Sequence, residues 1–309
     1  MIKLFKINHH IVDTSQFDPL LNDGVVEEFE QKIADFVGAK YACSFHSATM
    51  AIMLSLLEEE KTTITVPSIL PPVVVNAILC SGHKINFRDD VDWVGHSYVL
   101  HRFSDYKIID SAQQIYQGQY TQEANNNDLI VYSFYPTKPI GGYDGGMIVS
   151  NDKNKIDRLR ILSRNGMSLG ENSWERKIIL PGWKMYMNSI QAYIASKNFE
   201  KLKEKTGQFE EIKLYYNKEF GISNTSNHLY RLHVKDNNQF IADMKQKGIQ
   251  CGIHYKALHN MDYCKISGLS LPESDKEENT TVSIPYNEAL TAEQAKKIVK
   301  EVKPYVVTP

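Results

Sequence analysis

Hydrophobic residues in the first sixty positions recur with the spacing of helices. Between residues 25 and 37, apolar side chains return every three or four positions, which predicts an amphipathic helix, and Gly38 follows where a helix end favours glycine. Residues 50–57 predict a second helix, which Ser47 and Thr49 can cap. Pro71 and Pro72 are expected to open a third.

Short runs rich in β-branched residues lie between the helical segments. Such runs predict strands, here at 63–66, 84–87, 97–100, 107–109, 128–134 and 147–150, and residues 41–45 form a short apolar stretch before the second helix. Alternation of this kind predicts an α/β fold with a mostly parallel sheet and covering helices.

The pattern changes after residue 150. Longer helical stretches are expected at 155–162 and from Asn188 to about Tyr216, the second crossing toward another domain. A small α+β unit follows, with strands at 229–234 and 282–284, helices at 239–247 and 292–302, and a polar loop at 267–279. We therefore expect a large α/β domain over residues 1–205 and a smaller α+β domain over residues 206–309.

Composition narrows the classes of partner. The 309 residues are 42% hydrophobic with a formal net charge of −2, and no block of one sign is available to bind nucleic acid or an acidic membrane face. The first ten residues lack the apolar core of a signal peptide, and no run is long and apolar enough for a membrane span. We expect a cytoplasmic protein whose four cysteines, without any C-x-x-C pair, are free thiols.

Lys138 stands directly after the strand expected at 128–134. Pro136 and Pro139 discourage a continuing helix, so the lysine is expected on a rigid loop at the carboxyl edge of the sheet, where sites of α/β proteins gather. A lone lysine is more often a solvated surface charge. Other polar residues expected near Lys138 are needed to distinguish between these two interpretations.

Two further segments supply polar groups of the right kind. Asp110 ends the strand before Ser111, and a carboxylate there can pair with a protonated pyridine nitrogen or simply cap a helix. The segment from His46 to Thr49 opens a helix whose free N–H groups can hold a phosphate, and the hydroxyl of Ser133 can reach the same group. Ordinary helix capping and a structural serine are the alternatives.

Two other kinds of site find no support. The glycine-rich turn at 141–146 lacks the G-x-G-x-x-G spacing, and Met147 and Ile148 stand where a P-loop needs Lys and Ser or Thr. The ten histidines form no H-E-x-x-H or similar ligand set, so no metal is expected.

In this order the segments resemble the DegT-type sugar aminotransferases, a fold-type I family that depends on pyridoxal 5′-phosphate. The resemblance covers most of the chain, and its most specific motif is S-F-Y-P-T-K at 133–138. The other motifs lie at 36–44 with 47–52, 66–68 with 76–78, 109–113, 182–192, 254–259 and 283–285.

The resemblance implies an aminotransferase that moves an amino group from glutamate or glutamine to a keto-sugar nucleotide. A non-catalytic or regulatory protein that binds the cofactor is the alternative; a dehydratase of this fold has histidine where Lys138 stands. The implied homodimer shares its active sites between subunits. The implied roles are covalent attachment of the cofactor for Lys138, pairing with its pyridine nitrogen for Asp110, proximity to its ring hydroxyl for Gln113, phosphate binding for Ser47, Ala48, Thr49 and Ser133, a contribution from the second subunit for Lys184, and approach to the sugar for His254 and Tyr255.

The chain also departs from the family's pattern. The strand at 97–102 runs almost directly into 107–110, so a helix expected between them is missing, and the segment before Val25 is short. Pro71 stands where the family usually places an aromatic ring over the cofactor. Ala48 replaces a glycine, Asp144 a glutamate and Ala257 a proline.

Overall fold

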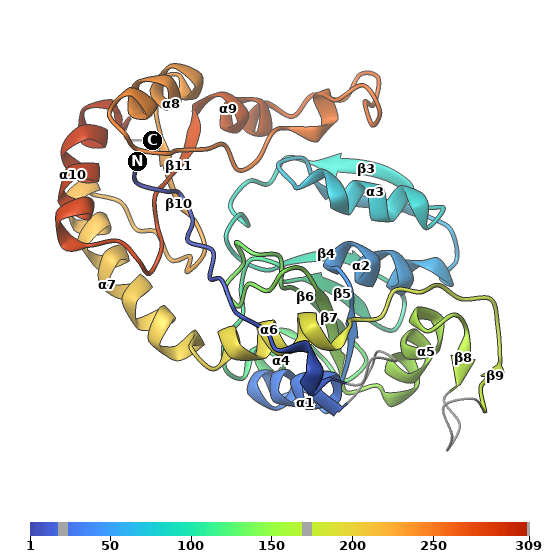
Figure 1. Ribbon diagram of the computed structural model, residues 1–309. Helices are drawn as coiled ribbons and strands as arrows, with labels where there is room; N and C mark the ends of the chain where they lie inside the picture. The colour runs from blue at the N-terminus through green and yellow to red at the C-terminus, as the bar shows by residue number, and fades with distance from the viewer. Residues whose placement is uncertain (18–23, 169–174, 308–309) are drawn as a thin grey trace.

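A five-stranded sheet forms the centre of the larger part of the molecule (Figure 1). The computed structural model describes residues 1–17, 24–168 and 175–307. In spatial order the strands are β1 (Tyr41–Phe45), β7 (Gly146–Ser150), β6 (Leu129–Ser133), β5 (Lys107–Asp110) and β4 (Tyr98–Arg102), and beside β4 lie the paired strands β2 (Thr63–Pro67) and β3 (Lys84–Arg88). The covering helices are α1 (Gly24–Val37), α2 (Ala48–Leu57), α3 (Pro72–Cys80), α5 (Lys153–Ser163) and α6 (Ser189–Phe199).

The α/β class is confirmed, but the sheet is mixed where mostly parallel pairing was expected. Strands β5 and β6 are parallel, as are β2 and β3. The pairs β1–β7, β7–β6 and β4–β5 are antiparallel. Strand direction is set by the connections, which hydrophobic patterning along single segments does not encode.

The antiparallel pairing of β4 follows from its short connections. Residues 103–106 alone join β4 to β5, whereas a parallel pair needs a crossover of about a dozen residues or more. Residues 89–97, between β3 and β4, likewise contain no helix. The sequence predicted that no helix lies between β4 and β5, and the structure confirms this. The consequence is a strand that begins where β5 ends, with Tyr98 opposite Asp110.

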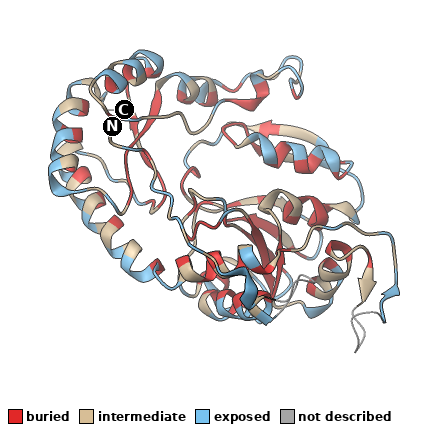
Figure 2. Ribbon diagram, viewed as in Figure 1, coloured by how far each residue is buried: buried red, intermediate tan, exposed pale blue. Residues whose placement is uncertain are grey.

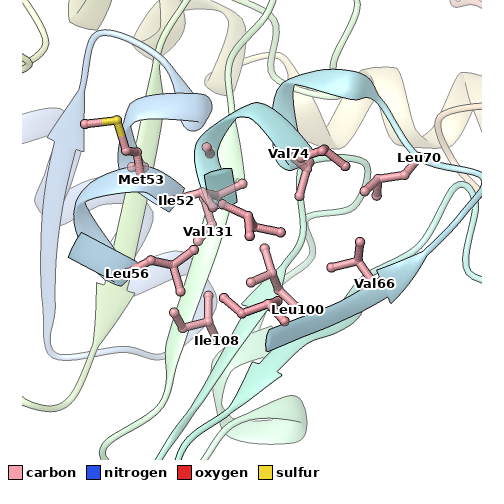
Figure 3. Packing of buried hydrophobic residues seen from close by; sticks show 14 of the residues in the cluster. Ile52, Met53, Leu56, Val66, Leu70, Val74, Leu100, Ile108 and Val131 are labelled. Atoms are coloured by element: carbon pink, nitrogen blue, oxygen red, sulfur yellow. The ribbon is translucent and has the colours of Figure 1, made fainter. Parts of the chain in front are cut away.

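Apolar side chains pack on both faces of the sheet, whose strands are largely buried (Figure 2). On one face, Leu100 of β4 and Ile108 of β5 meet side chains from α2 and α3 such as Leu56 and Val74 (Figure 3). On the other face, Phe29 and further residues of α1 pack with β6, β7 and α6. Strand β4, although antiparallel to β5, therefore contributes a fully buried side chain, Leu100, to the core.

The C-terminal unit is built around a two-stranded ribbon. Strands β10 (Tyr230–His233) and β11 (Thr281–Ile284) pair antiparallel, and their apolar side chains face a separate core. Ile2 pairs with Ile249, so the chain begins on this unit and then crosses to the larger one (Figure 1). Around the ribbon lie α7 (Leu202–Phe220), α8 (Asn237–Gln246), α9 (Pro272–Thr280) and α10 (Ala292–Val302). The boundary at residues 205 and 206, which falls inside α7, stays a prediction.

Two expectations for the second half were wrong. The single helix from Asn188 to about Tyr216 is two helices, α6 and α7, separated at Glu200 and Lys201. The polar loop expected at 267–279 contains α9, whose first N–H groups, those of Glu273 and Ser274, donate to Asp89 at 3.0 and 2.8 Å. Because this cap comes from the end of β3, the helix had no apolar stripe or local cap to reveal it.

The remaining elements are short. They are η1 (Thr14–Gln16), α4 (Gln119–Glu123), the antiparallel pair β8 (Met167–Ser168) and β9 (Lys177–Ile178), η2 (Leu258–Asn260) and η3 (Lys303–Tyr305). Among the described residues, no helix combines the length and apolarity needed to cross a bilayer. Within the same residues, no group of three or more His, Cys, Asp and Glu side chains could hold a metal ion.

Candidate active site

Lys138 lies in the turn that follows β6, and its side chain is buried. Its backbone N–H donates to the carbonyl of Tyr135 at 2.9 Å, which closes the turn between Pro136 and Pro139. Only 9% of the residue is exposed. Burial lowers the pKa of Lys138 to about 8, against the opposing effect of the Asp110 carboxylate. A larger share of the amine is therefore neutral, and nucleophilic, than in a surface lysine.

Asp110 ends β5 and faces the same space. Its Oδ1 accepts from the N–H of Ala112 and its Oδ2 from the hydroxyl of Tyr98, both at 2.9 Å. Burial raises the pKa of Asp110, while these two donors and the charge of Lys138 lower it. The structure thus brings the two predicted catalytic side chains into one electrostatic environment at the carboxyl ends of β5 and β6.

The predicted phosphate-binding residues converge around Gly146. Ser133, the last residue of β6, pairs with Gly146 of β7. A Cβ atom on Gly146 would lie only 2.4 Å from the backbone nitrogen of Ala48, so the start of α2 touches this strand. Ser47 caps α2, with its Oγ accepting from Met50 N–H at 3.4 Å. A helix N-terminus and a strand-end hydroxyl therefore meet at one place, which suits an anion.

Replacing Gly146 by alanine is expected to disturb this place. The added methyl group would collide with the backbone of Ala48, which cannot move as a flexible side chain can, so we expect a loss of about 1–3 kcal/mol in the free energy of unfolding. Binding of pyridoxal phosphate should weaken with it. Urea unfolding and titration with the cofactor measure both quantities.

Gly207 is the matched control for this substitution. It lies in α7, and a Cβ atom added there would meet nothing within 4 Å, so Gly207→Ala should be neutral or slightly stabilising. Equal stability and equal cofactor affinity for the Gly146 and Gly207 variants would show that the close approach at Gly146 is unimportant.

The other predicted cofactor residues are placed differently. Gln113 is buried and its Oε1 accepts from the N–H of Gly95 at 3.1 Å. Thr49 is half-buried in the first turn of α2, and Pro71 directly precedes α3. Lys184 is exposed on a segment that bridges to Arg164, so within one chain it does not join the other site residues.

His254 and Tyr255 approach the site from the C-terminal unit. His254 Nδ1 lies 3.0 Å from Ser283 Oγ, and burial together with the charges of Lys138 and Arg231 lowers the pKa of His254 to about 4. Burial and the Asp110 carboxylate raise the pKa of Tyr255. At neutral pH the C-terminal unit therefore presents a neutral imidazole and a protonated phenol to Lys138 and Asp110.

Three residues of this region were missed by the sequence analysis. His228 is buried, and burial together with the charge of Lys138 holds its pKa well below the usual value. Phe5 stacks on His228 at a centroid distance of 5.9 Å and meets His254 edge-on at 5.6 Å. Arg231 lies opposite Ser283 in the ribbon and pairs with Glu277. A charged residue inside a short apolar strand was the available signal for Arg231; Phe5 had none.

A cavity of about 240 Å³ adjoins the site between the two units. Gln113 and Pro139 line it from the larger unit, and Thr225 and Asn227 from the C-terminal one. Lys205 also lines the cavity, and its Nζ lies 3.8 Å from Glu288 Oε1. The space beside the predicted cofactor residues is thus hollow and lined by both polar and apolar side chains.

A known protein family matches this chain along most of its length. The sequence profile of the DegT/DnrJ/EryC1/StrS aminotransferase family matches residues 6–94 and 106–303. The residues between these two ranges include the reversed strand β4. The departure from the family therefore lies where the sequence lacked a helix.

Individual relatives are similar over nearly their full length. A UDP-4-amino-4,6-dideoxy-N-acetyl-beta-L-altrosamine transaminase of Campylobacter jejuni is 25% identical, and the alignment covers 94% of each chain. The spore coat polysaccharide biosynthesis protein SpsC of Bacillus subtilis is 24% identical, over 91% of this chain and 89% of its own.

Solved structures share the fold. The aminotransferase TlmJ from Streptoalloteichus hindustanus superposes with a TM-score of 0.81 at 20% identity, covering 98% of each chain. Helicobacter pylori PseC, an aminotransferase involved in the biosynthesis of pseudoaminic acid, gives a TM-score of 0.78 at 18% identity, covering 97% of this chain and 98% of its own.

Proposed function

Because this chain belongs to the DegT/DnrJ/EryC1/StrS aminotransferase family, as its motifs indicated, we propose that it transfers an amino group to a nucleotide-linked keto-sugar with pyridoxal phosphate held on Lys138. Enzymes of this family are pyridoxal phosphate-dependent sugar transaminases, and the chain is an aminotransferase of that kind. The observation that carries the proposal for the site is the buried pair of Lys138 and Asp110 at adjoining strand ends.

The residues present fit the cofactor. Lys138 supplies a buried amine for covalent attachment, and Asp110 a buried carboxylate for a protonated ring nitrogen. The start of α2 at Ser47, Ala48 and Thr49, with Ser133 beside it, supplies donors for a phosphate. Gln113 would hold the ring hydroxyl. When bound, pyridoxal phosphate supplies an electron sink for a carbanion at the carbon that carries the amino group.

Lys138 would also act as the general acid and base of the reaction. Its amine would take up the proton from the amino donor's α-carbon and release it again within the same site. The pKa of about 8 suits this exchange, because the amine then gains and loses a proton close to neutral pH. Asp110 keeps the negative charge that a positive ring nitrogen requires.

The substrate classes rest on the relatives. The Campylobacter relative is named as a transaminase of a UDP-linked amino sugar. We propose an acceptor of the same class, a keto-sugar nucleotide, with His254 and Tyr255 on its sugar side and glutamate or glutamine as donor. The lysine at position 138 favours transamination over the dehydratase alternative.

Assembly as a homodimer is part of the proposal. Lys184 is exposed and lies outside the single-chain site, so its predicted contribution would be made across a subunit interface. Action in the cytoplasm is likewise part of it.

Turnover tests the proposed function directly. Purified protein should absorb visible light through bound cofactor, and addition of glutamate or glutamine should shift that absorbance. A panel of keto-sugar nucleotides should then restore the original spectrum for the true acceptor. A spectrum that shows bound cofactor but does not respond to either donor would favour the non-catalytic alternative.

The pH dependence of cofactor capture offers a separate test of Lys138. Its pKa is lowered to about 8, so the neutral amine accumulates as pH rises toward and past 8, well below the value near 10.4 of an ordinary lysine. The rate at which cofactor-free protein captures pyridoxal phosphate is therefore expected to rise with pH and level off above about 8. Stopped-flow absorbance measures it, and a rate still climbing at pH 10 would contradict the lowered pKa.

A further inference from the structure

Strand β4 and the connection that leads into it from β3, residues 89–97, bring aromatic residues to the predicted cofactor site. Strand β4 runs antiparallel to β5, so its first residue, Tyr98, is paired with the last residue of β5, Asp110. The Tyr98 hydroxyl donates to Asp110 Oδ2 at 2.9 Å, and only 6% of the tyrosine is exposed. With a long crossover and a parallel β4, residue 98 would start at the opposite edge of the sheet.

The ring of Tyr98 is held from several sides. The indole ring of Trp93, from the same connection, packs against it at a centroid distance of 4.4 Å, and the Arg88 guanidinium lies 5.9 Å from its centroid. The Asp90 carboxylate also acts on the hydroxyl electrostatically. These neighbours leave the hydroxyl little freedom to move away from Asp110.

The same connection also holds the second residue expected at the cofactor ring. The N–H of Gly95 donates to Gln113 Oε1 at 3.1 Å, and the carbonyl of Gly95 accepts from Ser226 Oγ of the C-terminal unit at 3.0 Å. Gly95 has a φ of +97°, and a Cβ there would lie 2.6 Å from Ser226 Oγ. Residues 95–98 therefore hydrogen-bond to both Gln113 and Asp110, and Gly95 links them to the C-terminal unit.

A buried carboxylate needs such partners to stay ionised. Burial raises the pKa of Asp110, and the groups that lower it are the N–H of Ala112, the hydroxyl of Tyr98 and the charge of Lys138; the phenol of Tyr255 faces it from the C-terminal unit. Burial and the Asp110 carboxylate raise the pKa of Tyr98 well above its usual value, so the hydroxyl keeps its proton and donates.

We propose that Tyr98 is a positioning residue of the transamination site, which fixes the Asp110 carboxylate and keeps it ionised toward the ring nitrogen of the cofactor. The inference rests on the proposed function. Tyr98 acts through Asp110, and it is available for this task because a four-residue connection joins β4 to β5 and the two strands are antiparallel.

Tyr98→Phe in the purified holoenzyme tests the proposal, since it keeps the ring against Trp93 and removes only the hydroxyl. We expect pyridoxal phosphate to bind about tenfold more weakly, the effect of one hydrogen bond to a charged group. Affinity should fall on acidification from a higher pH than in the wild type, because the lost donor raises the pKa of Asp110. The kcat should decrease more than the KM for glutamate changes.

Tyr106→Phe is the matched control. Tyr106 is equally buried, donates to Glu59 Oε1 at 2.6 Å and directly precedes β5, at the end remote from Asp110. Its loss should lower the unfolding temperature without changing cofactor affinity or the pH profile. Trp93→Leu, which keeps the Tyr98 hydroxyl but frees its ring, should weaken cofactor binding in the same direction by a smaller factor.

Three outcomes would overturn the inference in distinguishable ways. If the wild type binds cofactor and responds to glutamate while Tyr98→Phe matches it in affinity and pH profile, Tyr98 is only a structural residue and the proposed function stands. If the wild type binds no pyridoxal phosphate, the proposed function fails and this inference fails with it. Should Tyr98→Phe not fold, unchanged affinity in Trp93→Leu overturns the inference.

Discussion

Replacing Lys138 by alanine is expected to lower kcat for transamination by more than about 10⁴-fold. General acid–base catalysis alone contributes about 10²–10⁴-fold, and this variant also loses the covalent anchor of the cofactor. The visible absorbance that depends on the attachment should disappear. Single-turnover assays with glutamate and absorbance spectra of the purified variant measure the two effects.

Lys203→Ala is the control for this variant. Lys203 is exposed on α7, so its removal should change neither the spectrum nor kcat. Thermal unfolding of both variants shows whether the fold is kept. A Lys138→Ala protein that is folded and turns over at more than about a tenth of the wild-type rate would exclude Lys138 from the chemistry.

Replacing Asp110 by alanine is expected to lower kcat by about 10²–10³-fold, the range for loss of one preorganised electrostatic group in a buried site. The charge matters more than the shape, since Asp110→Asn keeps the size and an oxygen acceptor but removes the anion. Both variants should therefore be impaired. Kinetics at saturating substrate and cofactor titrations check the expectation.

Asp128 provides a matched buried carboxylate at the opposite edge of the sheet. It precedes β6, accepts from the N–H groups of Lys107 and Asn125 at 2.8 and 2.7 Å, and is 2% exposed. Asp128→Asn should reduce stability and leave kcat of the folded enzyme unchanged. Near-normal turnover in Asp110→Asn, or equal losses in the two variants, would contradict the assigned role of Asp110.

Several predicted elements agree closely with the structure because their signals are local. The helix at 292–302 has the expected bounds, the strand at 147–150 differs from β7 by one residue, and Ser47 caps α2 as its position indicated. In each case the hydrophobic period or a capping side chain lies within the element itself. Helix α9 had no such local signal, because its cap, Asp89, is far away in the chain.

The candidate site likewise contains some residues with a local sequence signal and others without one. Lys138, Asp110 and Ser133 could be predicted because each stands at the end of a recognisable strand, and strand ends meet at one edge of a sheet. Phe5, His228 and Arg231 belong to the N-terminal segment and the C-terminal unit. Their place beside the site depends on how two parts with separate hydrophobic cores pack together, which patterns along single segments do not encode.

By itself the sequence determined the α/β class, the side chains expected at the candidate site and the absence of a helix between 102 and 107. Tertiary structure decided the direction of β4 and with it the partner of Asp110. The physical reason is that a four-residue connection closes only a hairpin, and whether the resulting strand pairs with β5, with Tyr98 opposite Asp110, depends on packing across the whole sheet.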